Sequence, residues 1–450
     1  MKTIKIGTGA GYADDRIQHG VDLVNYGQIN YIIFECLAER TIAIAQQAKL
    51  KDPKLGYNNW LDIRLEPILK KAKAKGIKII SNMGAANPQA AAEKIASIAR
   101  EQRVEGLKIA AVTGDDVFEQ IKQLDSVMIE DGKKVSELGI DNLIAANAYL
   151  GAEPIVEALS AGADIVITGR VADPSLFVAP IAFENNLRLD GDWTMLGKAT
   201  CAGHLMECGT YVSGGFYGDP GIKDIQGFDD LGQPICEFQS DGCFVITKRP
   251  QTGGEVSIGT CSEQLLYEIH DPARYITPDV VADFSAVTME QVGPDRVSIS
   301  NATGHPRTST LKVNVAYHDS YAVIGEFSYG GVGCVDRAKL ACDAAIKRFK
   351  RLNLPITECR TDIIGYNSLF SENTYGNGAL PNEVRVRVAV RTSSKDYRQR
   401  GIIANEIRSL SFNGPYGYGG PSVVAKDVIA INSVLIPREL VHTTVTMTEV

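Results

Sequence analysis

The sequence predicts an α/β chain with two domains, a parallel-sheet domain over residues 1–195 and an α+β domain over residues 196–450. In the first part, short apolar runs alternate with segments of helical spacing, which is typical of a parallel sheet. From about residue 196 onward, glycine-rich loops join strands that alternate apolar and polar residues, the pattern of an antiparallel sheet with one solvated face. With 450 residues and 44% hydrophobic content, the chain is long enough to bury two cores.

The strands of the first domain are near-continuous apolar runs, as burial on both faces of a sheet requires. They are Thr3–Ile6, Tyr31–Phe34, Ile77–Ile80, Lys108–Val112, Leu143–Ala146 and Asp164–Thr168. With helical segments such as Asn87–Arg100 between them, these strands indicate a Rossmann-like domain. Ligands of open parallel sheets bind beyond the carboxyl ends of the strands, so we expect the site in the loops that follow them.

The second domain is expected to mix helices with antiparallel strands. In VRVRVAVR, the valines at 384, 386, 388 and 390 share one face and the arginines at 385, 387 and 391 lie on the other. Helical spacing returns at Arg337–Lys350 and Asp396–Leu410. The glycine-rich NGPYGYGGPS (Asn413–Ser422) is either a lid or substrate loop, or a tight structural turn.

Charge and composition exclude several classes of function. The net charge of −8 leaves no basic stripe for a phosphate backbone, so we expect no nucleic-acid partner. Apolar runs are too short for a membrane span and MKTIKIG does not resemble a signal peptide, so a cytoplasmic small-molecule enzyme is expected, as a homo-oligomer. The nine cysteines form no CxxC pair and are expected to be reduced thiols.

The opening stretch GTGAGYADDR departs from a dinucleotide fingerprint. Gly7, Gly9 and Gly11 form GxGxG rather than GxGxxG, although Glu35 after the second strand is placed to bind a ribose hydroxyl. The carboxylates of residues 14 and 15 would repel a pyrophosphate at the start of the next helix. Three interpretations stay open: a dinucleotide loop, a purely structural turn, or a substrate loop in which Asp14 and Arg16 face the ligand.

Two further motifs carry reactive side chains. In ITGRVADPS, Arg170 either holds a substrate carboxylate or pairs with Asp173, which is otherwise an acid–base candidate, a metal ligand or a helix cap. In CAGHLMECGT, helical spacing puts Cys201, His204 and Cys208 on one face, with Glu207 beside them. These residues suit acid–base or nucleophilic catalysis, a metal site, or simple packing.

Asparagines follow several of the predicted strands, and we expect three of them to contact substrate: Asn82, Asn87 and Asn147. The thiol of Cys36 is not a candidate nucleophile, because Glu35 and Glu39 oppose the helix dipole that would activate it. No motif indicates which metal, if any, the site would take.

Taken together, GTGAGYADDR, YIIFECLAERT, NMGAANP, AANAYLGAEPIVEAL, ADIVITGRVADPSLF and GHLMECG resemble the acyclic terpene utilisation (AtuA-like) family over most of the chain. The resemblance implies catabolism of branched acids through acyl-coenzyme A intermediates, and it supplies no catalytic residues. Longer relatives append a ferredoxin-like domain of about a hundred residues, a typical domain size. Because this chain ends soon after its last expected strand, a small ferredoxin-like companion subunit is a hypothesis.

The leading functional hypothesis is a lyase or hydratase acting on a branched or multiply carboxylated acid, free or as a coenzyme A thioester. Arg170 would hold a carboxylate while Asp173, His204 or Glu207 moves a proton. The alternatives are a nicotinamide-dependent oxidoreductase and a non-catalytic subunit that requires its small partner.

Overall fold

The computed structural model describes residues 2–370 and 380–450, which divide into two compact units. Unit 1 comprises residues 1–316 and 431–450, and unit 2 comprises residues 317–430. These units do not follow the boundary predicted near residue 196. The strands that come soon after that boundary pair with the first strand of the chain, so they extend the N-terminal sheet rather than begin a new body.

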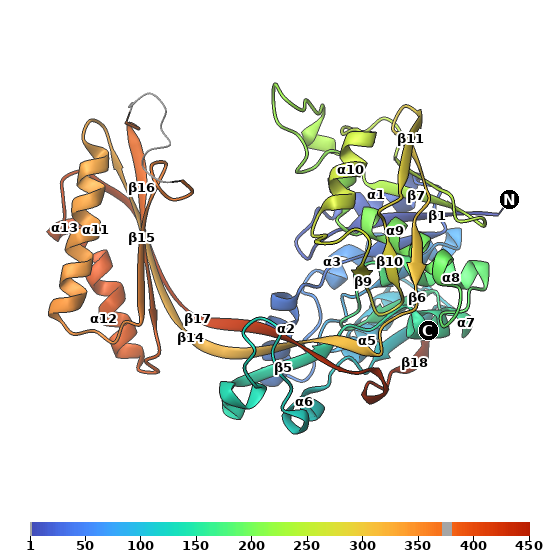
Figure 1. Cartoon of the computed structure of the whole chain (residues 1–450), viewed down its shortest axis with the longest axis horizontal. Coiled ribbons are helices and arrows are strands. Elements are labelled where there is room, and N and C mark those ends of the chain that lie inside the picture. The colour runs from blue at the N-terminus through green and yellow to red at the C-terminus, as the bar shows by residue number, and fades with distance from the viewer. Residues whose placement is uncertain (1, 371–379) are drawn as a thin grey trace. The chain divides into compact units, whose positions relative to one another are not determined.

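Unit 1 is built on a ten-stranded mixed sheet with the order β11-β12-β8-β7-β1-β2-β3-β6-β4-β18 (Figure 1). Strands β1, β2, β3, β6 and β4 run parallel at its centre, and antiparallel strands extend it on both sides. The strand bounds are β1 Thr3–Ala10, β2 Tyr31–Phe34, β3 Lys78–Ser81, β4 Lys108–Thr113, β6 Ile165–Thr168, β7 Pro234–Gln239, β8 Phe244–Lys248, β11 Thr288–Gly293, β12 Arg296–Ser300 and β18 Thr444–Glu449.

Five of the six predicted parallel strands lie in this central sheet, and the sixth does not. The segment predicted at Leu143–Ala146 is β5 (Leu143–Ala148), which pairs with the long strand β14 (Thr310–Gly330). The two neighbours of β4 are β6 and β18, so no edge is left beside it for β5.

Helices cover both faces of the central sheet, because adjacent strand residues point into two different cores. Ile80 belongs to the core on one face of the sheet, and Ile79 belongs to the core on the other face. The first core includes α7 (Glu153–Ser160), α8 (Ser175–Asn185) and α9 (Trp193–Glu207), and the second includes α1 (Gln18–Tyr26), α3 (Leu61–Leu65), α4 (Leu69–Lys75) and α5 (Pro88–Glu101). Helices α2 (Glu39–Lys51), α6 (Phe118–Leu124) and α10 (Ile258–Leu266) complete the unit.

Helix α9 carries the GHLMEC motif and is buried almost throughout. A small three-stranded sheet packs against it, formed by β9 (Tyr275–Ile276), β10 (Val281–Asp283) and β13 (Thr303–His305). A Cβ atom on Gly203 would lie 2.7 Å from the carbonyl oxygen of Pro174. Glycine is therefore required for the close approach that brings the end of α9 to the strand ends.

Unit 2 has the element order β-α-β-β-α-β of the ferredoxin-like motif. It consists of β14, α11 (Cys334–Arg351), β15 (Glu358–Ile364), β16 (Glu383–Thr392), α12 (Tyr397–Arg408), the short α13 (Leu410–Asn413) and β17 (Tyr418–Pro437), with the sheet order β15-β16-β14-β17. A domain of the class expected from a separate partner thus lies inside this chain, between two strands that each have residues in both units.

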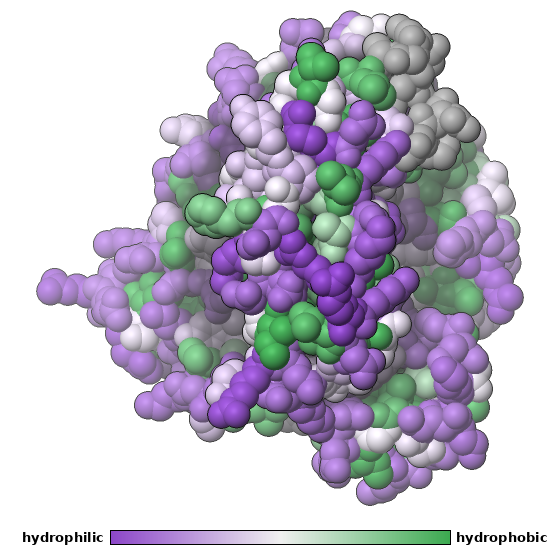
Figure 2. All heavy atoms as spheres, turned by 90° about the vertical axis from the view of Figure 1, so that its left-hand side faces the viewer, coloured by the Kyte–Doolittle hydropathy of each residue, from purple (hydrophilic) through white to green (hydrophobic). Residues whose placement is uncertain are grey.

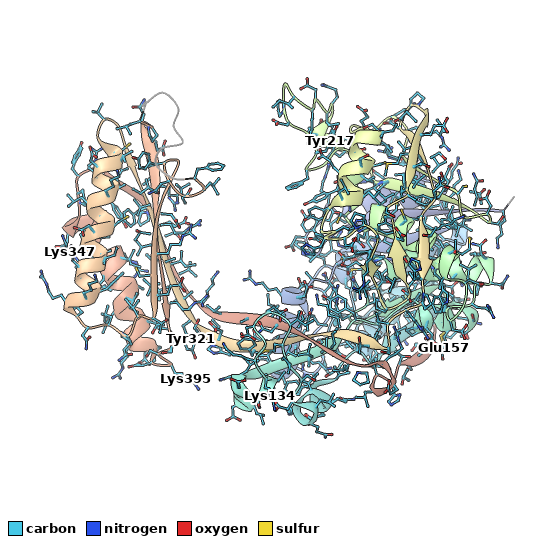
Figure 3. The ribbon with its side chains drawn as sticks, in the orientation of Figure 1. Lys134, Glu157, Tyr217, Tyr321, Lys347 and Lys395 are labelled. Carbon is cyan, nitrogen blue, oxygen red and sulfur yellow. The ribbon has the colours of Figure 1, made fainter. Side chains whose placement is uncertain are left out.

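The helices of unit 2 lie on one side of its sheet (Figure 1). The four predicted valines of β16 are buried against them, so that alternation is confirmed. The outer helix surface is mainly hydrophilic, with scattered hydrophobic side chains (Figure 2), and Lys347 lies on this outer side (Figure 3), paired with Asp343 at 2.5 Å. The glycine-rich segment at 413–422 belongs to this unit, and β17 begins within it at Tyr418.

Candidate functional site

The loops after three parallel strands surround a cavity of about 880 Å³ in unit 1, which we call the main cavity. The loops after β1, β2 and β6 meet there with the C-terminal end of α9 and the segments 208–231 and 267–268. The cavity wall includes Gly11, Tyr12, Asp15, Arg16, His19, Glu35, Leu37, Glu39, Arg170, Asp173, Cys208, Tyr211, Phe216, Tyr267 and Glu268. The expected gathering of polar turns at the strand ends is therefore present for these three loops.

In the loop after β1, the backbone amides that a cofactor phosphate would need are hydrogen-bonded to a carboxylate of the same loop. The backbone N–H groups of Gly11 and Arg16 donate to the two carboxylate oxygens of Asp15, at 2.9 and 2.7 Å. Helix α1 begins only at Gln18, so the tight strand-to-helix turn of a dinucleotide motif is absent from this loop. Both observations disfavour a pyrophosphate at this position.

Gly11 is constrained by the approach of α9 rather than by its backbone angles. A Cβ atom at this position would lie 2.5 Å from the carbonyl carbon of Cys208 and 2.6 Å from the nitrogen of Gly209. The glycine lets the loop after β1 lie directly against the end of α9, and together they form one wall of the main cavity.

Glu35 follows the second strand and is held by groups that orient its carboxyl. Its Oε1 atom accepts hydrogen bonds from Asn82 Nδ2 at 2.9 Å and from the backbone N–H of Leu37 at 3.0 Å. Asn82 also accepts from the backbone N–H of Cys36 at 2.7 Å, so it bridges the ends of β2 and β3. The predicted role of Asn82 in the site therefore takes the form of positioning Glu35, not of lining the cavity.

Arg170 is the central cation of the site, and its side chain is only 2% exposed. Its Nη2 donates to Asp173 Oδ1 at 2.7 Å, and its Nη1 donates to the carbonyl of Leu37. The guanidinium also stacks over the ring of Tyr149, 4.3 Å from the centroid. Its Nε atom is buried without a hydrogen-bond partner, and each of the two terminal nitrogens makes one of the two hydrogen bonds just described.

Glu35 and Asp173 form an interacting pair of carboxyls on the cavity wall. Burial raises the pKa of Glu35 well above its usual value, and the charge of Asp173 raises it further, while Arg170 acts in the opposite direction. Burial also raises the pKa of Asp173, Arg170 opposes the rise, and the charge of Glu39 adds to it. Both carboxyls therefore lose their protons less readily than free carboxyls do, a property that suits an acid–base pair.

His204 and Glu207 form a second pair, which lies behind the cavity wall. His204 is 1% exposed, and burial lowers its pKa to about 4, so its ring is neutral at neutral pH. Its Nε2 lies 3.3 Å from the carbonyl of Leu265, which can only accept, so Nε2 carries the proton. Nδ1 must then accept from the Glu207 carboxyl, 3.1 Å away, and burial raises the pKa of Glu207 accordingly.

The thiol of Cys208 lines the main cavity but is not activated as a nucleophile. Burial raises its pKa, and the neighbouring Glu207 raises it further. The thiolate is the reactive form of cysteine, so the environment opposes nucleophilic catalysis by this residue. Cys201 is completely buried in the core and serves as packing.

A metal site of the kind considered for these carboxyls would need several ligating side chains to converge on one point. Over residues 2–370 and 380–450, no three histidine, cysteine, aspartate or glutamate side chains are grouped so that they would hold a metal ion. In the same residues, no helix combines the length and the apolar character that crossing a membrane requires.

Comparison with known protein families decides the assignment. The model of the acyclic terpene utilisation family protein AtuA matches residues 4–447. The chain belongs to the AtuA family. A search of the curated proteins finds no match.

Several predicted site residues of this AtuA family member lie outside the main cavity. Gly7 and Gly9 pack within the core, where a Cβ on Gly9 would lie 2.5 Å from the ring of Phe34. Asp14 accepts from the indole of Trp60 at 2.8 Å. The two remaining asparagines have local roles, since Asn87 caps α5 and Asn147 donates to Asp115 at 2.9 Å.

Three functional candidates were not predicted from the sequence. Glu39 lies on the cavity wall and accepts a hydrogen bond from the hydroxyl of Tyr149, which also accepts from Asn314 Nδ2 at 3.0 Å. His19 lines the same cavity, with its Nδ1 3.6 Å from Asp15. Glu39 and Tyr149 lie in polar segments that follow predicted strands, but the hydrogen bond between them depends on tertiary packing. For His19, the one sequence signal is its position just after the loop that follows the first strand.

Proposed function

We propose that the chain is a hydratase or lyase acting on a small branched or multiply carboxylated acid, free or as a coenzyme A thioester, by general acid–base catalysis. The observation that supports this most is the interacting pair Glu35 and Asp173 on the wall of the main cavity, held around Arg170. Two carboxyls with raised pKa values can hold one proton between them, so one acts as base while the other acts as acid.

In the dehydration direction, the ionised carboxylate removes a proton from the carbon next to the carbonyl. The protonated carboxyl donates its proton to the hydroxyl group on the following carbon, the carbon–oxygen bond breaks, and a carbon–carbon double bond and water form. Hydration is the reverse, and each turnover exchanges the protonation states of Glu35 and Asp173. Such assistance is worth about 10²–10⁴ in rate per group.

The other candidate residues support this pair rather than replace it. His204 is neutral and buried behind the wall, and its hydrogen bond fixes the carboxyl of Glu207 at the end of α9. We therefore assign His204 and Glu207 to positioning the α9 end, next to Cys208. Arg170 donates one hydrogen bond to Asp173 and one to Leu37, and we assign it the role of setting the ionisation of the pair.

Solvent exchange tests the proposal across a range of candidate substrates. Purified protein is incubated in D₂O with a panel of branched 3-hydroxyacyl and 2-enoyl coenzyme A thioesters and the matching free acids. Deuterium at the carbon next to the carbonyl, with interconversion of the two members of a pair, is expected for one of them. Mass spectrometry measures both.

The variants Glu35→Gln and Asp173→Asn should lower this rate at least about 100-fold. Glu157→Gln is the matched control, because Glu157 is an exposed residue of α7 (Figure 3) and does not line the cavity. Circular dichroism checks that each variant is folded. Unchanged exchange in both cavity variants would contradict the acid–base assignment, and silence across the whole panel would favour the non-catalytic alternative.

A further inference from the structure

A second cavity, of about 420 Å³, lies on the other side of Asp173 and Tyr149 and is built entirely from residues of unit 1. Asp173 lines both cavities. Tyr149 lines the second cavity, and the guanidinium of Arg170, a residue of the main cavity, stacks over its ring. Arg170, Tyr149 and Asp173 therefore lie between the two cavities, and we call these three residues the partition. Asp173 therefore belongs to the walls of both cavities.

The two cavities have opposite electrostatic character. The main cavity is lined by five carboxyl side chains and the arginines at 16 and 170. Among the described residues that line the second cavity, Asp173 is the only acidic one, and Arg274 and Lys312 are the cations. Arg438 adds positive charge beside it, since its Nη2 donates to the carbonyl of Pro278, another wall residue, at 2.7 Å.

Arg274 has the donors that an anion needs. Its side chain is exposed, and within the described residues its guanidinium has no hydrogen bond or ion pair with the protein. Lys312 is only loosely committed, with its Nζ 3.9 Å from Glu39 and 4.9 Å from the centre of the Tyr149 ring. A planar guanidinium binds a carboxylate through two parallel hydrogen bonds, and an ammonium adds a point charge.

The rest of the second cavity suits a short hydrocarbon group. Ile276, Leu311 and Leu435 contribute apolar side chains to the wall. A ligand with a carboxylate at Arg274 and a branched apolar body against these residues would extend toward the partition. That orientation directs the hydrocarbon end of the ligand, away from its carboxylate, toward Asp173.

We propose that the second cavity is the binding site for the carboxylate of a small branched organic acid, held by Arg274 and Lys312, with the hydrocarbon part of the acid extending toward Asp173. This inference rests on the proposed function, since it takes the class of its ligand, a small branched acid, from there. It moves the substrate anchor from Arg170, where the sequence alone indicated it, to a cation that the protein leaves unpaired.

The test is a binding measurement that does not depend on turnover. Titrations followed by ligand NMR use two probes of the same shape, 3-methylbut-2-enoate and its neutral amide, with the full-length protein. Arg274→Gln is expected to weaken binding of the carboxylate about 10- to 100-fold and to leave the amide unchanged, because only the charged hydrogen bonds are lost. Arg274→Lys should recover part of the affinity.

Two further variants separate this inference from the proposed function. Arg100→Gln is the matched control, because Arg100 is an exposed arginine of α5 that lines neither cavity. Arg16→Gln reports on the main cavity. Loss of carboxylate affinity in Arg16→Gln but not in Arg274→Gln would overturn the inference, as would no measurable binding to the wild type at millimolar concentration. Loss in Arg274→Gln alone supports it even if Glu35→Gln shows that the proposed chemistry is wrong.

Discussion

Replacing Gly11 by alanine tests the contact between the loop after β1 and the end of α9. The glycine does not have a positive φ, so alanine fits its backbone conformation and any effect comes from space. The new methyl group would lie 2.5 and 2.6 Å from backbone atoms of Cys208 and Gly209. Carbon atoms prefer a separation of about 3.5–4.0 Å, so one of the two segments must move by roughly 1 Å. Backbone cannot rotate aside as a flexible side chain can.

The expected loss of unfolding free energy is about 1–3 kcal/mol, the usual cost of overpacking. The smaller entropy of the unfolded alanine chain offsets about 0.4–1 kcal/mol of that loss. With a urea dependence of about 2–3 kcal/mol/M, a net loss of about 1–2 kcal/mol lowers the urea midpoint by roughly 0.3–1 M. Tryptophan fluorescence is the appropriate probe, because both tryptophans, Trp60 and Trp193, belong to unit 1.

Gly293→Ala is the matched control for this measurement. Gly293 lies in β11 of the same unit, and a Cβ there would meet the Arg296 side chain only at ordinary contact distances, 3.7 Å or more. Its urea midpoint should stay the same or rise slightly. Equal midpoints for Gly11→Ala and the wild type would refute the close contact on which this wall of the main cavity depends.

Three other predictions address single groups. Burial raises the pKa of Asp115 to about 6 from about 3.8 in the unfolded chain, so the folded state binds the proton more tightly. The contribution of this proton to the free energy of unfolding is full below about pH 4 and is lost as the pH rises through about 6. Asp115→Asn should therefore flatten the plot of urea midpoint against pH over that range, and an unchanged plot would contradict the raised pKa. Ile407→Ala should destabilise unit 2 by about 2–5 kcal/mol in calorimetry, because Ile407 is completely buried. Val332→Ala, at a residue that is 94% exposed, should leave the stability unchanged, and equal effects of the two variants would contradict the prediction. Iodoacetamide near neutral pH should alkylate Cys359 well before Cys201, because the pKa is raised for both thiols but of the two only Cys359 is exposed. Peptide mass spectrometry measures the two alkylation rates, and equal rates would contradict the prediction.

The sequence predicted the elements of this fold better than their partners. Continuous apolar runs located five central strands, and the alternation around Val386 located a half-buried one, because side-chain periodicity is a local property. The pairing of β5 with β14 and the long-range pairing of β7 with β1 join segments far apart in the chain. Nothing in the local pattern distinguishes those partners, so the predicted domain boundary and the place of Leu143–Ala146 both differ from the structure.

The candidate site was predictable where chemistry follows directly from a strand end. Glu35 and Arg170 meet because β2 and β6 end at the same edge of a parallel sheet, a rule of the fold class. Gly9 was predicted there too, but it lies within β1, before the strand ends, and packs against Phe34. The unpaired state of Arg274 had no sequence signal, because whether a cation finds a partner depends on every segment packed around it.

The strand β18 has a consequence for how the chain is made. It pairs with β4, yet it leaves the ribosome only after all of unit 2 has been synthesised. At roughly 5–20 residues per second, synthesis of the 330 residues between Thr113 and Thr444 keeps one edge of the nascent N-terminal sheet open for about 15–65 seconds. Unit 2 can fold during that interval, whereas unit 1 must wait for Thr444–Glu449 before its sheet is closed at that edge. Until then, the backbone groups on that side of β4 form an open strand edge, which is the kind of edge that can pair with another chain.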